Sequence, residues 1–360
     1  MNGRRLNVLV VDDSAVVRQT LSAILGQESD FSVSAAADPI IAQGKMARER
    51  PDVIVLDLEM PRMDGLTFLR GLMATDPIPV VVCSGLTVAG AEHAMRALEE
   101  GAVSIVTKPK IAVREFLYES AVTLVDAVRS AAAARLTLRR GRGPTAIAEV
   151  RKPSTSNVRP ERGAAEGTDV IAIGASAGGT DALRAVLQSF PADAPGTLIV
   201  QHMPETFTTA FAARLNSLCA AEVTEARDGD PVLAGRVLVA PGNRHLTLRR
   251  DGGRYVAQVT DGPLVSRHRP SVDMLFRSVA SVAGPRAVGA ILTGMGIDGA
   301  EGLLEMKRAG AHTLAQDEAT CVVFGMPREA IARGAVHVVS PLGSMAAAIL
   351  SARPAKMEAR

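Results

Sequence analysis

Short runs of apolar residues alternate with helical patterns along the first 130 residues of the chain. The first run, LNVLVV, is followed by a helical pattern that begins at Ser14. The five runs occupy residues 6–11, 31–37, 52–58, 78–84 and 102–107. Strands that alternate with helices form parallel sheets with both faces covered, and strands buried on both faces are almost continuously apolar. The pattern predicts an α/β domain with a five-stranded parallel sheet over residues 1–130.

The same alternation resumes at Asp169 and continues to about residue 355. Its apolar runs occupy residues 169–175, 197–201, 222–226, 236–240, 287–293, 311–316 and 335–340. Helical stretches such as residues 181–188 and 271–282 separate most of them. HLTLRR, the turn residues DGG and RYVAQVT have the alternation of a β-hairpin around an Asp-Gly turn. We predict a second, doubly wound and mostly parallel sheet with an antiparallel hairpin inserted along the chain.

Residues 131–168 show no sustained periodicity and are rich in Pro, Gly, Ser and Thr. From Arg135 to Arg162 the chain has seven arginines and one lysine against two glutamates, a net charge of +6. This composition is typical of a flexible, solvated tether. A docking site for an acidic partner or a membrane surface is the alternative. We predict a flexible basic linker between the two domains.

Composition narrows the class of protein. Hydrophobic residues make up 47% of the chain and charged residues 22%, as in ordinary globular proteins. The net charge is only +2 and aromatic residues are 3%, so neither charge nor stacking surface favours a nucleic-acid partner. Cys83, Cys219 and Cys321 are widely spaced in apolar surroundings, which indicates buried thiols rather than disulfides or metal ligands.

We expect neither a signal peptide nor a membrane span. The apolar run near the N-terminus is too short for a signal-peptide core and ends in acidic residues. No segment approaches the roughly 20 apolar residues that cross a bilayer. We expect a cytoplasmic protein.

Chemically complementary residues follow the strands of the first domain. Asp12 and Asp13 follow the first predicted strand, Asp57 ends the third, Ser84 follows the fourth and Lys108 the fifth. Ligands of open α/β sheets bind at the carboxyl ends of the strands. Three carboxylates, a hydroxyl and an ammonium at that edge can hold Mg²⁺ and balance a phosphoryl group on one carboxylate. Simple helix capping explains one such acid but not the whole set.

This set, over residues 5–128, resembles the response-regulator receiver family, whose fold is flavodoxin-like. The resemblance implies that Asp57 accepts a phosphoryl group from a histidine kinase, with Asp12 and Asp13 helping to bind Mg²⁺. It also implies that Ser84 contacts the phosphoryl group and that Lys108 pairs with it.

GASAG, at residues 174–178, stands between a predicted strand and a predicted helix and fits G-x-S-x-G. Such a turn presents a serine hydroxyl, here that of Ser176, beside a helix N-terminus where backbone N–H groups favour negative charge. A phosphate-cradling loop and a structural glycine turn are the alternatives. A dinucleotide-binding loop is disfavoured because Ser176 stands where a glycine is needed and the next strand ends in Gln-His rather than in an acid.

Two further strand ends supply partners for a serine nucleophile. His202 follows the run TLIVQ and can take the serine proton, because it leaves its strand at the same edge of the sheet. Asp298, in the Gly-rich segment LTGMGIDGAEG, can fix the imidazole tautomer and stabilise the imidazolium. Together the three residues predict a Ser-His-Asp hydrolase.

Other residues could fill the same roles. His245 and His268 are alternative bases, and Asp273 is an alternative acid. His245 begins a hairpin strand and His268 lies among arginines, so both rank below His202. The order Ser, His, Asp also differs from the Ser, Asp, His order of the α/β-hydrolase fold.

Together with the receiver and the basic linker, the motifs GASAGGTDALR, QHMP, APGNRHL, RPSVDMLF, LTGMGIDGAEG and AQDEATCVVFGMP resemble the chemotaxis protein-glutamate methylesterase family (CheB). The resemblance implies hydrolysis of glutamate methyl esters on chemoreceptors, with deamidation of particular receptor glutamines, in sensory adaptation. It implies the triad Ser176, His202 and Asp298, with backbone N–H groups near Ala177 and Met295 as candidates for the oxyanion hole. No metal is expected for hydrolysis. Chemoreceptors and a chemotaxis-type histidine kinase are the expected partners, at membrane receptor arrays.

Two other functions compete with this interpretation. A receiver joined to a degenerate hydrolase domain could act only as a docking module, although the intact triad counts against it. A DNA-binding response regulator is disfavoured because the second half has the pattern of a large α/β domain and not of a compact helix-turn-helix.

Overall fold

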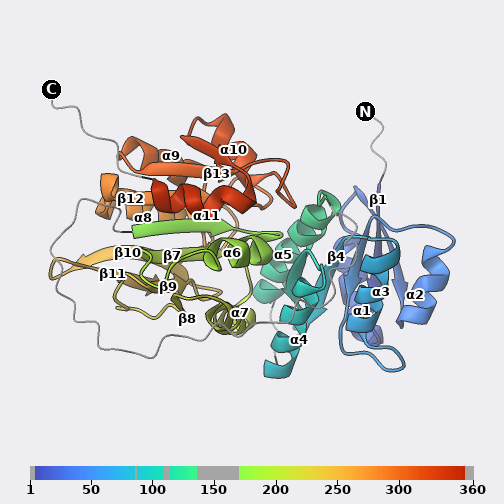
Figure 1. Ribbon diagram of the computed structural model, residues 1–360. Helices are drawn as coiled ribbons and strands as arrows, with labels where there is room; N and C mark the ends of the chain where they lie inside the picture. The colour runs from blue at the N-terminus through green and yellow to red at the C-terminus, as the bar shows by residue number, and fades with distance from the viewer. Residues whose placement is uncertain (1–4, 86, 109–113, 136–169, 353–360) are drawn as a thin grey trace. The chain divides into compact units, whose positions relative to one another are not determined.

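The computed structural model describes residues 5–85, 87–108, 114–135 and 170–352. The chain divides into two compact units, Met1–Thr145 and Ala146–Arg360 (Figure 1). Residues 136–168 of the predicted linker lie outside the described residues.

The first unit is built around a five-stranded sheet in which every strand pairing is parallel, in the order β2-β1-β3-β4-β5. Its strands are β1 (Leu6–Val11), β2 (Phe31–Ala36), β3 (Val53–Leu56), β4 (Val80–Ser84) and β5 (Ser104–Thr107). Its helices are α1 (Ala15–Leu25), α2 (Pro39–Met46), α3 (Gly65–Thr75), α4 (Val88–Glu99) and α5 (Arg114–Ala132). All four residues of β3 are buried, as expected for a central strand covered on both faces.

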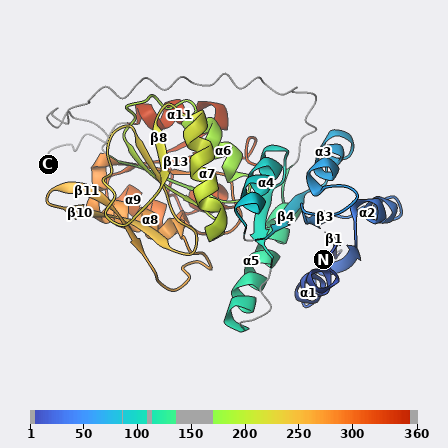
Figure 2. The same ribbon diagram turned by 90° about the horizontal axis from the view of Figure 1, so that it is seen from below.

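The second unit contains a seven-stranded sheet, also parallel throughout, in the order β14-β13-β12-β6-β7-β9-β8. Its strands are β6 (Val170–Ala175), β7 (Gly196–Gln201), β8 (Glu222–Glu225), β9 (Arg236–Val239), β12 (Ala287–Ile291), β13 (His312–Gln316) and β14 (Val338–Ser340). Its helices are α6 (Gly179–Leu187), α7 (Glu205–Leu218), α8 (Val272–Val282), the short 3-10 helix η1 (Gly284–Arg286), α9 (Ala300–Arg308), α10 (Met326–Ala332) and α11 (Leu342–Ser351). Helices α6, α7 and α11 lie on one face, and α8 and α9 on the other (Figure 2).

The predicted hairpin forms a two-stranded antiparallel sheet of its own. It consists of β10 (His245–Asp251) and β11 (Arg254–Thr260). Its apolar side chains Leu246, Leu248 and Ala257 belong to the same buried cluster as Phe276 of α8. The hairpin therefore stays outside the seven-stranded sheet because its apolar face is buried against α8. The fold class predicted from the sequence is confirmed for both units.

Both sheets have a switch point where the chain reverses the direction in which it adds strands. In the first unit this point lies between β1 and β3, and in the second between β6 and β12. Crevices at such points, outside the carboxyl ends of the strands, are the usual ligand sites of open α/β sheets. The two sites described below lie at these positions.

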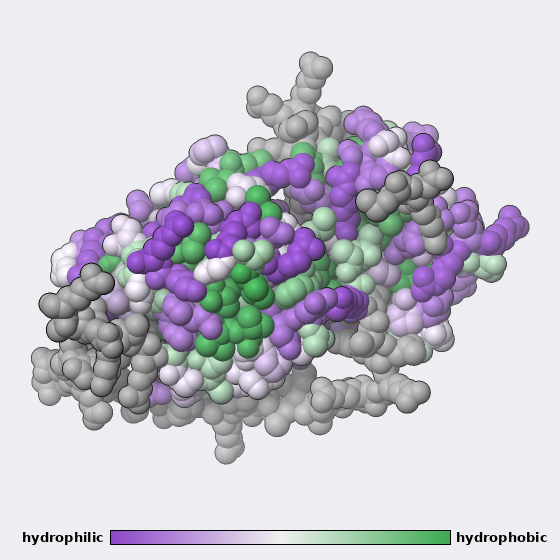
Figure 3. All heavy atoms as spheres, turned by 90° about the horizontal axis from the view of Figure 1, so that it is seen from above, coloured by the Kyte–Doolittle hydropathy of each residue, from purple (hydrophilic) through white to green (hydrophobic). Residues whose placement is uncertain are grey.

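No helix in the described part of the chain is long and apolar enough to cross a membrane. Hydrophilic residues cover most of the face shown in Figure 3, with smaller hydrophobic areas between them. All three cysteines are buried, as the sequence predicts.

Candidate active site and acidic pocket

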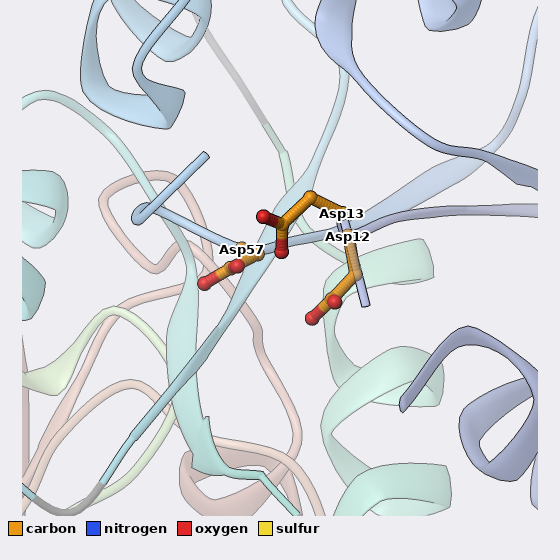
Figure 4. Close-up of side chains that lie close together, drawn as sticks. All are labelled: Asp12, Asp13 and Asp57. Carbon is orange, nitrogen blue, oxygen red and sulfur yellow. The ribbon is translucent and has the colours of Figure 1, made fainter. Parts of the chain in front are cut away.

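The switch point of the first unit carries three carboxyl groups. Asp12 and Asp13 follow β1, Asp57 follows β3, and one carboxylate oxygen from each lies within 4.8 Å of the others (Figure 4). Asp12 and Asp57 are buried, whereas Asp13 is exposed. The parallel pairing of β1 with β3 brings these strand ends together. The structure thus gathers the acidic residues that the sequence predicted.

Lys108, which follows β5, joins two of these carboxylates. Its Nζ lies 3.0 Å from Asp12 Oδ2 and 2.8 Å from Asp57 Oδ2. Burial would lower the pKa of Lys108, but its contacts with Asp57 and Asp12 outweigh burial and raise it. Burial also raises the pKa of Asp57, an effect that Lys108 opposes. The ammonium is therefore a firmly charged group beside the Asp57 carboxylate.

The carboxylate oxygens of this pocket suit a hard divalent cation. Asp12 Oδ2 and Asp57 Oδ2 are buried, and the Lys108 ammonium is the one partner that each has within the described ranges. Mg²⁺ prefers oxygen ligands and is commonly bound through one or two carboxylates. Ser84 is buried at the end of β4, but its hydroxyl donates a hydrogen bond to Gly90 O at 3.3 Å rather than to Asp57.

Ser176 stands in the turn between β6 and α6, with its backbone held from three sides. Its N–H donates to Thr293 O at 3.0 Å, and its carbonyl accepts from Gly179 N–H and from Gln201 Nε2, both at 2.8 Å. Gly178, the N-cap of α6, has a φ of +73°, and a Cβ there would lie 2.5 Å from Val322 Cβ. The turn requires glycine at this position for both reasons.

His202 reaches the same edge of the sheet from the end of β7. Its N–H donates to Ala175 O at 3.1 Å, so the histidine begins directly beside the residue that precedes Ser176. Its Nε2 lies 2.8 Å from Asp298 Oδ2, and the side chain is 8% exposed. Its buried Nδ1 has no hydrogen-bond partner in the part of the chain that the structure describes. With Nε2 donating to the carboxylate, Nδ1 keeps the lone pair that a base needs.

Asp298 is the most fully coordinated acid of the site. Oδ2 accepts from His202 Nε2 and from Val272 N–H at 2.7 Å, and Oδ1 accepts from Ser271 Oγ at 2.7 Å and Asp273 N–H at 3.0 Å. Val272 and Asp273 are the first residues of α8, so the carboxylate also meets the positive end of that helix. Four donors fix its position.

The surroundings of Asp298 keep it ionised. Burial would raise its pKa, but the hydrogen bond and charge of His202, with the bond from Ser271, outweigh burial and lower that pKa to about 2. A carboxylate that stays charged at all physiological pH values can orient a neutral imidazole and stabilise its protonated form.

The alternative residues occupy other positions. His245 is buried and its Nε2 lies 2.9 Å from Pro263 O. Asp273 accepts from Gly302 N–H at 2.8 Å and from Ser266 Oγ at 3.2 Å rather than from His202. His268 does reach the site, where its ring stacks on His202. Of the candidate histidines and acids, the structure therefore pairs His202 with Asp298.

Two backbone N–H groups border Ser176. Ala177 follows it in the turn, and Met295 follows Gly294, where a Cβ would lie 2.7 Å from Ser176 Cβ. Neither the Ala177 nor the Met295 N–H donates a hydrogen bond among the described residues. The Ser176 hydroxyl is likewise outside the hydrogen bonds found there, and such contacts are often long in enzymes without substrate.

Sequence reasoning missed two supporting residues. Gln201 donates to both Ser176 O and His202 O, at 2.8 and 3.1 Å, and so ties the nucleophile's turn to the base's strand. Ser271 bonds to Asp298 and also accepts from Met274 N–H as the N-cap of α8. The sequence offered two signals for them. One is a glutamine between an apolar run and a histidine, and the other is a serine before a helical pattern.

Comparisons with known proteins agree with this arrangement. The family model described as CheB methylesterase matches residues 171–349, and that of the response regulator receiver domain matches residues 8–117. A protein-glutamate methylesterase/protein-glutamine glutaminase of Anaeromyxobacter dehalogenans is 59% identical over 95% of both chains. One of Rhizobium johnstonii is 54% identical over 96% of this chain and 98% of its own.

A solved structure supports the second unit separately. The CheB methylesterase catalytic domain of Thermotoga maritima is 34% identical, covers 51% of this chain and 98% of its own, and superposes with a TM-score of 0.50. Fold and sites define a class in which a response-regulator receiver is joined to an α/β hydrolytic domain. Within that class, the chain belongs to the protein-glutamate methylesterase/protein-glutamine glutaminase (CheB) family.

Proposed function

We propose that the chain removes methyl esters from glutamate side chains of chemoreceptors and deamidates particular receptor glutamines, with Ser176 as nucleophile. The observation that carries this proposal is the His202–Asp298 pair, 2.8 Å apart, at the switch point that also holds the Ser176 turn. The names of the relatives supply the substrate class, since both are called protein-glutamate methylesterase/protein-glutamine glutaminase.

The reaction follows from the roles of the three residues. His202 Nδ1 takes the Ser176 proton as Oγ attacks the ester carbonyl, and the imidazolium returns that proton to the leaving methanol. Water then attacks the glutamyl ester of Ser176, giving its proton to His202, and the serine oxygen leaves with that proton. A glutamine substrate follows the same course and releases ammonia. No step uses a metal ion.

Ala177 and Met295 N–H groups are the proposed oxyanion hole. Ala177 follows Ser176, and Met295 follows Gly294, which lies against Ser176; neither N–H donates a hydrogen bond within the described ranges. Donors aimed at the developing oxyanion stabilise the transition state more than the substrate, by about 3 kcal/mol for one donor.

The acidic pocket is the proposed control site. Asp57 accepts a phosphoryl group from a chemotaxis-type histidine kinase, while Ser84 and Lys108 contact that group. Ser84 must then exchange its bond to Gly90 O for one to the phosphoryl oxygens. Asp12, Asp13 and Asp57 would hold Mg²⁺, which neutralises charge on the phosphoryl oxygens.

The proposed organisation is a receiver domain over residues 1–130, a flexible basic linker over 131–168 and a methylesterase domain over 169–355. Phosphorylation of the receiver shifts the chain toward an active form, as a population shift between two states. Chemoreceptors as substrate and a kinase as phosphodonor place the protein in the cytoplasm at receptor arrays. We propose no nucleic-acid partner.

Replacing Ser176 by Ala tests the proposal directly. We expect loss of methanol release from methylated receptors and loss of labelling by an electrophilic serine probe, with phosphorylation at Asp57 unchanged. A chain that only docks receptors would show neither activity before the substitution. Full methanol release by Ser176→Ala would refute the nucleophile.

A further inference from the structure

The ring of His268 lies flat against the ring of His202. The two centroids are 3.7 Å apart and the planes differ by 12°. The His202 imidazole is therefore fixed at its edge by Asp298 and on one face by a second aromatic ring. The terminal torsion of a histidine has a broad energy profile, so a hydrogen bond at one atom leaves the ring free to tilt. A stacked ring removes that freedom.

His268 stands at the end of a tight turn whose backbone conformation is unfavourable for its residues. Val265 and His268 exchange two backbone hydrogen bonds, of 3.1 and 2.9 Å. The two residues between them, Ser266 and Arg267, have φ values of +51° and +69°. Two successive residues in the left-handed region favour Gly or Asn, and neither occurs here. Such strain persists where surrounding contacts hold it, and it is common at functional sites.

Asp273 provides the contact that holds this turn. Its Oδ2 accepts from Ser266 Oγ at 3.2 Å, and its Oδ1 accepts from Gly302 N–H at 2.8 Å. The turn is thereby tied to α8, whose first residues donate to Asp298, and to α9, which begins two residues after Asp298. His268 and Asp298 both contact His202, and the hydrogen bonds of Asp273 connect the segments that carry them.

His268 is a weak base whose ring is neutral near neutral pH. Burial, with the nearby charge of His202 adding to it and Asp298 opposing it, lowers the pKa of His268 to about 3. The charged groups that act on it are His202, Asp298 and Arg267. A ring that stays neutral can present its π face to a cation, and His202 becomes a cation when it takes the serine proton.

We propose that His268 is a positioning residue for the hydrolytic reaction, which holds the His202 ring in its reactive orientation by stacking and supports its protonated form through the π face. The inference rests on the proposed function of Ser176, His202 and Asp298. It assigns a role to the planar ring of His268 and none to its nitrogens.

Three substitutions in the full chain separate the contribution of the His268 ring from the contribution of its nitrogen atoms. His268→Phe keeps a planar ring, His268→Leu keeps apolar volume without one, and His268→Ala removes both. His312→Ala is the matched control, because His312 stacks on His337 at the opposite end of the sheet, with centroids 5.1 Å apart. We measure the rate of Ser176 labelling by a fluorophosphonate, and kcat and KM for methanol release.

We expect His268→Ala and His268→Leu to slow both labelling and kcat by about 10-fold to 100-fold with KM unchanged, since misorientation of a catalytic group costs rate and not binding. His268→Phe should recover most of the rate, to within about threefold of the unsubstituted chain. His312→Ala should match the unsubstituted chain. Thermal unfolding verifies that the second unit of each variant is folded, and phosphorylation at Asp57 verifies the first.

Labelling of the His268→Ala and His268→Leu variants as fast as the unsubstituted chain would overturn the inference. So would a His268→Phe variant as slow as His268→Ala, because the nitrogens would then be required. Labelling does not depend on the substrate, so the inference survives if the chain labels at Ser176 but releases no methanol from receptors. An unsubstituted chain that does not label at all would overturn both proposals.

Discussion

Asp298 shows how much one buried residue can do. Its carboxylate caps the first turn of α8 and orients His202, so it belongs to the folding of the unit and to the proposed chemistry at once. Buried charges are tolerated only when paired and hydrogen-bonded, and Asp298, with 1% of its surface exposed, accepts from four donors.

The depressed pKa of Asp298 predicts a pH-dependent contribution to stability. The pKa falls from 3.8 to about 2 on folding, so the contribution is complete above pH 4 and is lost as the pH falls through 2. That shift corresponds to about 2 kcal/mol. We expect the stability difference between the unsubstituted chain and Asp298→Asn to shrink by this amount between pH 4 and pH 2.

Urea-dependent hydrogen exchange of peptides from β6 measures this stability difference in the full chain, because these peptides report the unfolding of the second unit alone. A stability difference that stayed constant over the same pH range would contradict an ionised Asp298 as the source.

At the residue scale, the sequence was informative wherever a strand ended. Ser176, His202 and Asp298 were proposed because each follows an apolar run, and the structure brings the three segments to one edge of the sheet. His268 was ranked only as an alternative base, since a histidine among arginines carries no sign of burial. Its stacking depends on a turn whose left-handed residues, Ser266 and Arg267, are not typical of one.

At the scale of elements, the site depends on close approach between the Ser176 turn and the segment after β12. Gly294 lies at that contact. A Cβ on Gly294 would lie 2.4 Å from Met326 Sδ, 2.7 Å from Ser176 Cβ and 3.1 Å from Ser176 N. Contacts below 3 Å cannot be kept, so one of the two segments must move.

We predict that Gly294→Ala slows Ser176 labelling by about 100-fold and destabilises the second unit by roughly 1–3 kcal/mol, because the added methyl displaces the nucleophile's turn. Gly343→Ala is the control, as Gly343 lies in α11 and a Cβ there meets nothing within 4 Å. It should keep the full labelling rate. Equal labelling rates in the two variants would show that the contact can relax.

On the scale of the whole molecule, two α/β units each present a site at their own switch point. The proposed regulation requires that chemistry at Asp57 alter chemistry at Ser176. We predict that a small-molecule phosphodonor raises the rate of methanol release by the full chain and leaves the rate of an Asp57→Asn variant unchanged.

A chain that begins near Gly163 should release methanol faster than the unphosphorylated full chain. Equal rates there would indicate that the receiver acts through localisation instead.

Removal of divalent cations separates the two proposed chemistries. Only the acidic pocket uses Mg²⁺ in the proposal, because Asp12, Asp13 and Asp57 supply its oxygen ligands. We expect a chelator to abolish phosphorylation of Asp57 and to leave labelling of Ser176 unaffected. Added Mg²⁺ should restore phosphorylation. Loss of labelling on chelation would place a metal requirement in the second unit.

The sequence by itself determined the two α/β units, the hairpin and the residues at the strand ends. These follow from local patterns, since apolar runs between helices specify buried parallel strands and parallel strands share a carboxyl edge. It could not determine which strands are neighbours, because the packing of all faces together decides that.

Only the tertiary structure placed β6 against β12, although most of the second unit separates them along the chain. That pairing decided which strand ends lie side by side, that Nε2 of His202 faces Asp298, and that His268 covers the ring. Such contacts join residues about 30 to 100 positions apart, beyond the reach of any periodic pattern in the sequence.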